Sequence, residues 1–77
     1  MDNYFSLNNL PIGESAIVSS LLSKGAERQR MMDLGLINGT EIKALQKSPA
    51  GDPIAYFFRG TVIALRASDA KKIIIKH

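Results

Sequence analysis

The chain has 77 residues, of which 45% are hydrophobic and 22% charged, and ten Lys and Arg against seven Asp and Glu give a net charge of +3. A chain of this length makes one domain with a small core, which we expect over residues 1–77, and the absence of cysteine excludes disulfides and thiolate sites. The basic residues are scattered among acids, with Lys71-Lys72 as the longest run, which favours an ordinary solvated surface over a nucleic-acid-binding stripe.

The N-terminal stretch predicts a helical turn and not a leader. Residues 1–11 have neither a basic segment nor an apolar centre, so they do not resemble a signal peptide, and no apolar run approaches the length of a membrane span. We expect a capped turn from Ser6 to Leu10, ended by Pro11. Leu7 and Leu10 should attach this turn to the core, and a first strand should follow over residues 15–22.

A short helix over residues 24–34 is the most distinct element of the sequence. Ser23 precedes it as a candidate N-cap. Gly35 follows at the position where a left-handed residue ends a helix, so Leu36 can fold back onto Met31 in a Schellman motif. Leu36 and Ile37 are expected to attach the helix to the barrel, and exposure for a partner is the alternative. The apolar arc should be buried and holds Met31, Met32 and Leu34; the polar arc holds Ala26, Gln29, Arg30 and Asp33.

The next segment predicts a turn, a strand and a loop. Asn38-Gly39 forms the turn, because both residues tolerate positive φ, and the strand covers residues 40–47. Ile42 and Ala44 point to one of its faces, and Glu41, Lys43 and Lys47 point to the other. Residues 48–53 form a loop, since its two prolines cannot donate to a strand ladder.

The remaining residues predict three more strands. Two of them, at residues 54–58 and 61–66, are joined by Arg59-Gly60 in a type I turn with a glycine bulge. Phe57 faces away from Ile54, Tyr56 and Phe58. Ser68 is expected to cap one helical turn through Lys71, and a last strand follows over residues 73–75.

These elements predict a mainly β fold. Five short strands, one short α-helix between strands 1 and 2 and a helical turn before the last strand suggest a small, partly open SH3-like barrel with mostly antiparallel neighbours. Four glycines are expected to serve the backbone conformation and not a chemical function: Gly35, Gly39, Gly51 and Gly60.

The sequence offers no catalytic constellation. His77 is the only histidine and is the last residue, and there is no G-x-S-x-G and no G-x-x-x-x-G-K-[ST]. Glu27 and Asp33 lie about 120° apart around the helix axis and cannot easily share one metal ion. Asp52 is interpreted as an Asx-type turn residue, and Met31 and Met32 as core residues and not soft-metal ligands. We therefore expect a protein that is not an enzyme and has no resident cofactor, while weak binding of ferrous iron or another transition metal stays open.

Several stretches, in order and spacing, resemble the family of the bacterial ferrous iron transport protein A. They are LPIGE at residues 10–14, ERQRMMDLGL at 27–36, GT at 39–40, SPAGDPI at 48–54, RG at 59–60 and IALR at 63–66. The resemblance covers the chain from about Leu7 to the last strand and implies an SH3-like barrel.

The resemblance also implies a function and a partner. The chain would be a small cytoplasmic accessory protein of ferrous iron uptake, held peripherally at the inner membrane through ferrous iron transport protein B, a permease with a GTP-binding cytoplasmic domain. It would dock onto that permease and modulate its assembly or activity, without binding nucleic acid or inserting into the membrane. Self-association through exposed edge strands stays open.

The alternative function is a metal-responsive binding module, because the same barrel occurs as the SH3-like domain of metal-dependent repressors. Without DNA-binding helices in this chain, that role would be exercised in trans. For either function the expected contact surface combines the polar arc of the helix with the proline-containing loop, and its residues are Gln29, Arg30, Asp33, Ser48, Pro49, Gly51, Asp52 and Pro53. Ser23, Gly35, Leu36, Gly39 and Gly60 are expected to act structurally.

Overall fold

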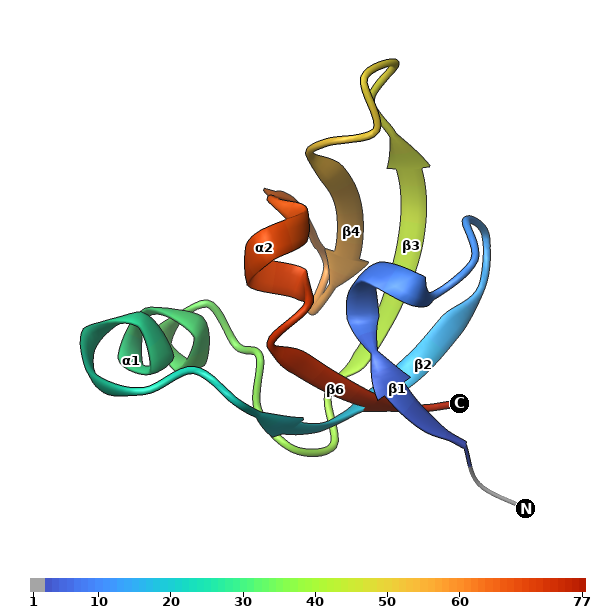
Figure 1. Ribbon diagram of the computed structural model, residues 1–77. Helices are drawn as coiled ribbons and strands as arrows, with labels where there is room; N and C mark the ends of the chain where they lie inside the picture. The colour runs from blue at the N-terminus through green and yellow to red at the C-terminus, as the bar shows by residue number, and fades with distance from the viewer. Residues whose placement is uncertain (1–2) are drawn as a thin grey trace.

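The computed structural model describes residues 3–77 (Figure 1), so Met1 and Asp2 of the expected domain lie outside the described residues. One antiparallel sheet of six strands has the order β1-β6-β2-β3-β4-β5. The elements are β1 (Tyr4–Ser6), the 3-10 turn η1 (Leu7–Asn9), β2 (Ser15–Leu21), α1 (Gly25–Asp33), β3 (Glu41–Lys47), β4 (Ile54–Phe58), β5 (Thr61–Leu65), α2 (Ala67–Ala70) and β6 (Ile73–Lys76). Among the described residues no helix is long and apolar enough to cross a membrane.

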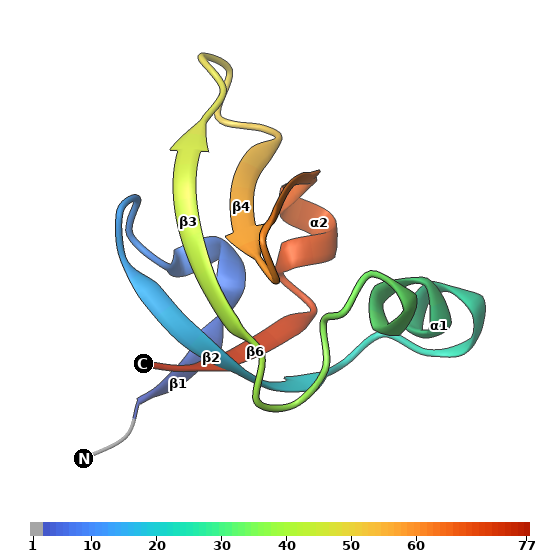
Figure 2. The ribbon, with the colours of Figure 1, turned by 180° about the vertical axis from the view of Figure 1, so that it is seen from behind.

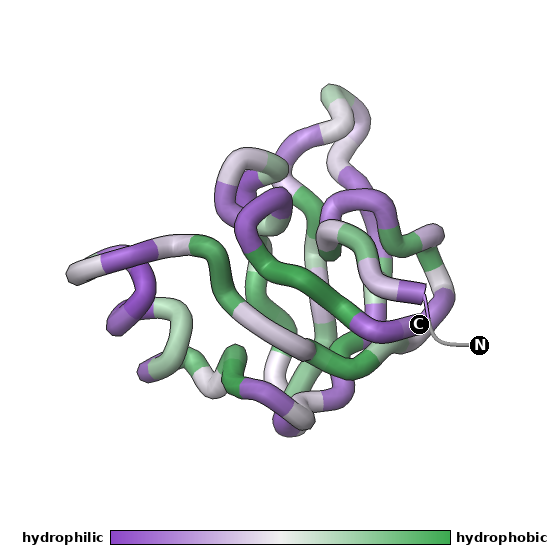
Figure 3. The backbone as a smooth tube through the Cα atoms, turned by 60° about the horizontal axis from the view of Figure 1, so that its bottom comes forward, coloured by the Kyte–Doolittle hydropathy of each residue, from purple (hydrophilic) through white to green (hydrophobic). Residues whose placement is uncertain are grey.

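The sheet bends around one hydrophobic core. Irregular register between Val18 and Ser20 in β2, and between Ala44 and Gln46 in β3, marks bulges, which increase strand bending. The turn η1 contacts both α2 and β6. The apolar stretch of β6 is the continuous hydrophobic segment before the C-terminus in Figure 3. The buried side chains include Leu7, Leu10, Val18, Met31, Leu36, Ile42, Tyr56, Phe58, Leu65, Ala70, Ile73 and Ile75.

The alternation of side chains along β3 and β4 is as the sequence predicts. Ile42 and Ala44 are buried while their charged neighbours are exposed, and Figure 2 shows β3 and β4 side by side. In β4 the side chains of Ile54, Tyr56 and Phe58 are buried, and Phe57 on the opposite face is 42% exposed. The 3-10 turn η1 and the buried Leu7 and Leu10 also lie where the sequence predicts a helical turn, but the Ser6 side chain does not cap this turn.

The prediction of five strands is wrong by one, because β1 was not recognised. Tyr4, Phe5 and Ser6 pair with Lys76, Ile75 and Ile74 of β6. A strand of three residues has too few positions to show alternation, and it forms here because its partner comes from the other end of the chain. Of the other five strands, β4 has the predicted bounds, and the remaining four differ from the prediction by one residue at one end.

The C-terminal end of α1 has the predicted Schellman geometry. Gly35 has φ of 102°. Its N–H donates to the carbonyl of Met32 at 3.0 Å, and the N–H of Leu36 donates to the carbonyl of Met31 at 3.1 Å. Met31 and Leu36 are buried, and Thr40 Oγ1 donates to the carbonyl of Gly35 at 2.8 Å.

The N-terminal end of α1 and most of its apolar arc differ from the prediction. Lys24 is the N-cap residue and no side chain caps the helix, while the Ser23 hydroxyl oxygen is buried without a hydrogen-bond partner. Met32 and Leu34 are 40% and 37% exposed, so Met31 alone of that arc is buried. The reason is that α1 stands beside the sheet instead of lying across it (Figure 1). Ile37, expected to pack with Leu36, is 38% exposed.

Two further turns differ from the prediction. Arg59 and Gly60 have φ of 52° and 77°, and Phe58 pairs directly with Thr61, as in a two-residue type I′ hairpin and not a type I turn with a bulge. In α2, Arg66 and not Ser68 occupies the N-cap position, and the Arg66 side chain makes no capping hydrogen bond. The first difference arises because Arg59 adopts a positive φ, which is uncommon for residues other than glycine.

Gly35→Ala should destabilise the protein more than Gly39→Ala does. Both glycines have similar φ, 102° and 97°, but a Cβ at Gly35 would lie 2.7 Å from Arg59 Cδ, whereas one at Gly39 meets nothing within 4 Å. We expect each change to cost on the order of 1–2 kcal/mol from backbone strain, with the larger loss at Gly35 and a still larger one for Gly35→Val. Urea unfolding measures these losses. In an Arg59→Ala background the difference should disappear; equal losses in the native background would show that this contact is unimportant.

Tyr56→Phe should reduce the loss of stability at alkaline pH. Tyr56 is fully buried, and burial raises the pKa of its phenol from 10.0 to about 12. Because the folded-state pKa is the higher one, the stabilising contribution is fully present below pH 10 and is lost as pH rises through about 12. The free energy of unfolding of Tyr56→Phe should therefore fall less over this range, by on the order of 2 kcal/mol. Tyr4→Phe removes a phenol hydroxyl at an exposed position and is the matched control.

Candidate interaction surface

Exposed apolar side chains, and not a cluster of metal ligands, distinguish the surface of the described residues. Within residues 3–77 no group of three or more His, Cys, Asp or Glu side chains could hold a metal ion. The large apolar side chains at the surface are Tyr4, Ile12, Ile17, Leu22, Met32, Leu34, Ile37, Phe57 and Val62. Several of them line grooves together with cationic groups, an arrangement suited to protein contact.

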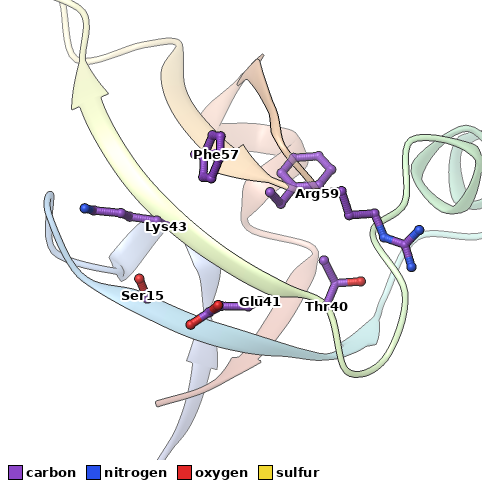
Figure 4. A pocket seen from close by; sticks show the side chains of 7 residues that line it. Ser15, Thr40, Glu41, Lys43, Phe57 and Arg59 are labelled. Atoms are coloured by element: carbon purple, nitrogen blue, oxygen red, sulfur yellow. The ribbon is translucent and has the colours of Figure 1, made fainter.

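The first groove lies on the outer face of the sheet and has a volume of about 500 Å³. Cross-strand register places Lys43 beside Phe57, and Phe57 beside Val62. Figure 4 shows Lys43 and Arg59 on either side of the Phe57 ring, with Arg59 directed toward the segment that follows α1. An exposed ring between two cations can receive an apolar side chain with acidic neighbours.

The second groove, of about 350 Å³, lies between α1 and β2. Arg28 Nη1 donates to the carbonyl of Leu21 at 3.0 Å and so connects the helix to the strand. Met32 and Ile37 line the groove and are partly exposed, and the buried Leu36 also contributes to its wall. These are the apolar side chains that sequence reasoning assigned to the core.

The expected contact residues on α1 are exposed, but most of them are engaged within the chain. Gln29 Nε2 donates to Asp33 Oδ1 at 2.8 Å along the helix. Arg30 Nη2 lies 3.6 Å from Asp69 Oδ2 of α2, while its side chain stays 61% exposed. The polar arc is therefore an exposed face, and the ion pair of Arg30 with Asp69 links it to α2.

The expected contact residues in the loop lie apart from those on α1. Figures 1 and 3 show residues 48–53 at the far end of the β3-β4 hairpin, away from α1. Backbone bonds from Gly51 N–H to Ser48 and from Ser48 N–H to Pro53 close the loop, at 2.8 and 3.1 Å. The structure thus does not combine the two predicted parts into one continuous surface.

Asp52 has a structural role that differs from the predicted Asx turn. Its Oδ1 accepts a hydrogen bond from the Ala67 N–H at 2.8 Å, so a loop carboxylate caps the first turn of α2. The two residues are 15 positions apart, and no sequence signal available from one chain links them. The same bond connects the loop, through α2 and Asp69, to Arg30 on α1.

Comparisons with known proteins converge on one family. A family model described as the FeoA domain matches residues 5–77. A Fe(2+) transport protein A/Fe(2+) transporter FeoB fusion protein from Porphyromonas gingivalis is 30% identical over 70 residues, covering 91% of this chain and 8% of that protein. This chain therefore spans less than a tenth of the length of that relative.

Solved structures give the same result. The FeoA-like protein from Clostridium acetobutylicum has a TM-score of 0.88 at 37% identity, covering 97% of this chain and 87% of that one. A zinc complex of Stenotrophomonas maltophilia FeoA, described as an SH3 domain protein, has a TM-score of 0.82 at 32% identity, covering 92% and 88%. A manganese-dependent transcriptional repressor, at 12% identity and a TM-score of 0.85 over 97% of this chain and 42% of that one, shares the fold alone.

Asp52→Ala should lower the free energy of unfolding by about 1 kcal/mol, because the first amide of α2 loses its acceptor. Asp52→Asn should retain most of the stability, since its Oδ1 still accepts this bond. Ser68→Ala is the matched control: Ser68 is exposed and caps nothing, so we expect no loss. Thermal unfolding distinguishes these cases, and a fully stable Asp52→Ala would mean that the cap contributes nothing.

Proposed function

The chain belongs to the FeoA domain family, and on that premise we propose that it is an accessory protein of ferrous iron uptake that docks onto a FeoB-type permease and modulates its assembly or activity. The observation that carries this proposal is the Porphyromonas gingivalis relative, in which both proteins are parts of one chain. Covalent joining raises the effective concentration of two modules, so it favours pairs that must contact each other. The partner is expected to be the cytoplasmic GTP-binding part, which would place this chain in the cytoplasm at the membrane surface.

The surface of the fold supports a binding role. Apolar side chains such as Phe57 and Met32 are exposed beside arginines and lysines, and a contact that buries them gains hydrophobic free energy. Docking alters the partner's activity only if one conformational state of the partner binds better than another. A tenfold preference requires about 1.4 kcal/mol, which a few side chains supply.

The exposed face of α1 is the part of the predicted contact surface that we retain for docking. Gln29, Arg30 and Asp33 are all exposed there. The loop at residues 48–53 has an internal structural role through Asp52, so it is the less favoured part. The alternative function, a metal-responsive binding module acting in trans, has support from fold likeness only.

Tagged protein should capture the detergent-solubilised permease, and its isolated GTP-binding domain, in a manner that depends on GTP or GDP. Arg30→Glu should weaken capture about tenfold, because it reverses a charge on the proposed face. Asp69→Asn is the control: it removes the 3.6 Å ion pair with Arg30 but leaves the arginine itself in place, so capture should persist.

Absence of capture in every nucleotide state, for the native chain, would overturn the proposal. If the chain alone then bound ferrous iron tightly, the metal-responsive alternative would be favoured.

A further inference from the structure

The strand β5 ends the sheet, and its outer edge has no strand beside it among the described residues. The two-residue turn at Arg59-Gly60 fixes which backbone groups lie on that edge. Phe58 and Thr61 flank the turn and form a hydrogen-bonded pair, and hydrogen-bonded and non-bonded pairs then alternate along the hairpin. Val62 and Ala64 belong to the non-bonded pairs, so their N–H and C=O groups point away from β4.

These outward groups are unpaired within residues 3–77. No hydrogen bond from another segment reaches the backbone of Val62 or Ala64. Two N–H and two C=O groups at alternate positions are what an added antiparallel or parallel strand would bind.

The edge also lacks the features that usually prevent pairing. The sequence Thr61–Leu65 contains no charged residue and no proline, and its pairing with β4 runs through five consecutive residues without a bulge. Edge strands of natural proteins are commonly protected by such features. Val62 is 58% exposed, so an apolar side chain adds to the unprotected backbone.

A depression of about 370 Å³ runs beside this edge, between α1 and α2. Leu34, Ile63 and Leu65 provide its apolar lining, and Leu34 is 37% exposed. A strand added to β5 would direct alternate side chains into this depression and onto the outer face, next to Val62 and Phe57. The apolar lining of the depression therefore suits the apolar side chains at alternate positions of an added strand.

Charge determines the kind of strand that fits. Arg59 precedes β5, Arg66 follows it, and Arg30 lines the depression. Among the described residues, Asp69 is the only acidic one that lines the depression, and Arg30 pairs with it at 3.6 Å. A second copy paired antiparallel about Ile63 would bring each Arg66 next to the Arg59 of the other copy, which like-charge repulsion disfavours.

We propose that the free edge of β5 binds an extended segment of a partner protein in which carboxylates flank an apolar centre. The segment adds a seventh strand to the sheet. Its backbone bonds to Val62 and Ala64, its apolar side chains contact Leu34 and Ile63, and its flanking carboxylates lie near Arg59 and Arg66, at the two ends of β5. With the permease as partner, the inference rests on the proposed function; the edge itself is testable without it.

Ala64→Pro tests the edge selectively. Proline removes the outward N–H of Ala64 without removing a bond to β4, and edge positions of this kind tolerate it. Ala64→Val keeps the N–H and enlarges the side chain, so it is the matched control. Amide spectra of ¹⁵N-labelled protein establish that each variant is folded.

The probe is the peptide acetyl-EVTVE-amide, with acetyl-KVTVK-amide as its charge-reversed control. Titration should shift the amide signals of Val62 and Ala64 in the native protein, and the acidic peptide should bind at least tenfold more tightly than the basic one. Ala64→Pro should weaken binding at least tenfold and Ala64→Val less than twofold. Should Ala64→Pro fail to fold, Arg66→Glu replaces it, expected to weaken binding at least fivefold, with Lys24→Glu as the equally charged control.

Shifts confined to other segments, or equal binding by Ala64→Pro and the native protein, would overturn the proposal. So would a concentration-dependent dimer in sedimentation that Ala64→Pro abolishes, because the edge would then serve self-association.

Repeating the capture of the GTP-binding domain with these variants separates the two proposals. Capture by Ala64→Pro at the native level rejects the edge as the docking site and leaves the proposed function intact. Loss of capture with Ala64→Pro but not with Ala64→Val supports both. If even the native chain captures nothing, the proposed function fails, and the peptide titration alone decides on the edge.

Discussion

The hydrogen-bonded ending of α1 at Gly35 is the constraint on which the arrangement of the candidate surfaces depends. Two backbone bonds reverse the chain there, Thr40 Oγ1 holds the Gly35 carbonyl, and the Arg59 side chain lies against the glycine. One contact region thereby joins α1, the start of β3 and the β4-β5 turn. Met31 also attaches α1 to the core. The polar links of α1 are exposed, such as the ion pair of Glu27 with Lys72 at 3.1 Å, and exposed pairs contribute at most about 1 kcal/mol each.

Features that depend on local residue chemistry could be predicted from the sequence. Alternation identified the buried faces of β3 and β4, because a half-buried strand repeats every two residues. Gly35 identified the helix end, since a left-handed residue there has few alternatives to glycine. Two of the misses depend on distant partners: β1 forms on β6, and Asp52 and not Ser68 caps α2. The burial of Ser23 without a hydrogen-bond partner among the described residues is a third miss, which local sequence does not indicate.

The candidate surfaces could be predicted only in part, for a related reason. Gln29, Arg30 and Asp33 are exposed because their positions on a short amphipathic helix require it. Met32 and Leu34 were assigned to the core because the sequence does not show how a helix is placed, and α1 contacts the rest through Met31 alone of its apolar arc. Their exposure creates the lining of two grooves. The two side chains that are more exposed than the sequence predicts, Met32 and Leu34, thus lie in the grooves that are suited to binding.

The two edge strands of the sheet, β1 and β5, differ in length and in how well they are protected against pairing with another strand. The edge strand β1 has only three residues, so this edge is short. The backbone of Asn3 exchanges hydrogen bonds with His77 at 2.8 and 3.4 Å, which continues the pairing of β1 with β6. The edge strand β5 has five residues, no charged side chain and an adjacent apolar depression. An edge left unprotected exposes the protein to aggregation, which natural proteins usually prevent. A small interface of the proposed kind would bind weakly and reversibly. Joining the two modules in one chain, as in the Porphyromonas gingivalis relative, would offset such weakness through effective concentration.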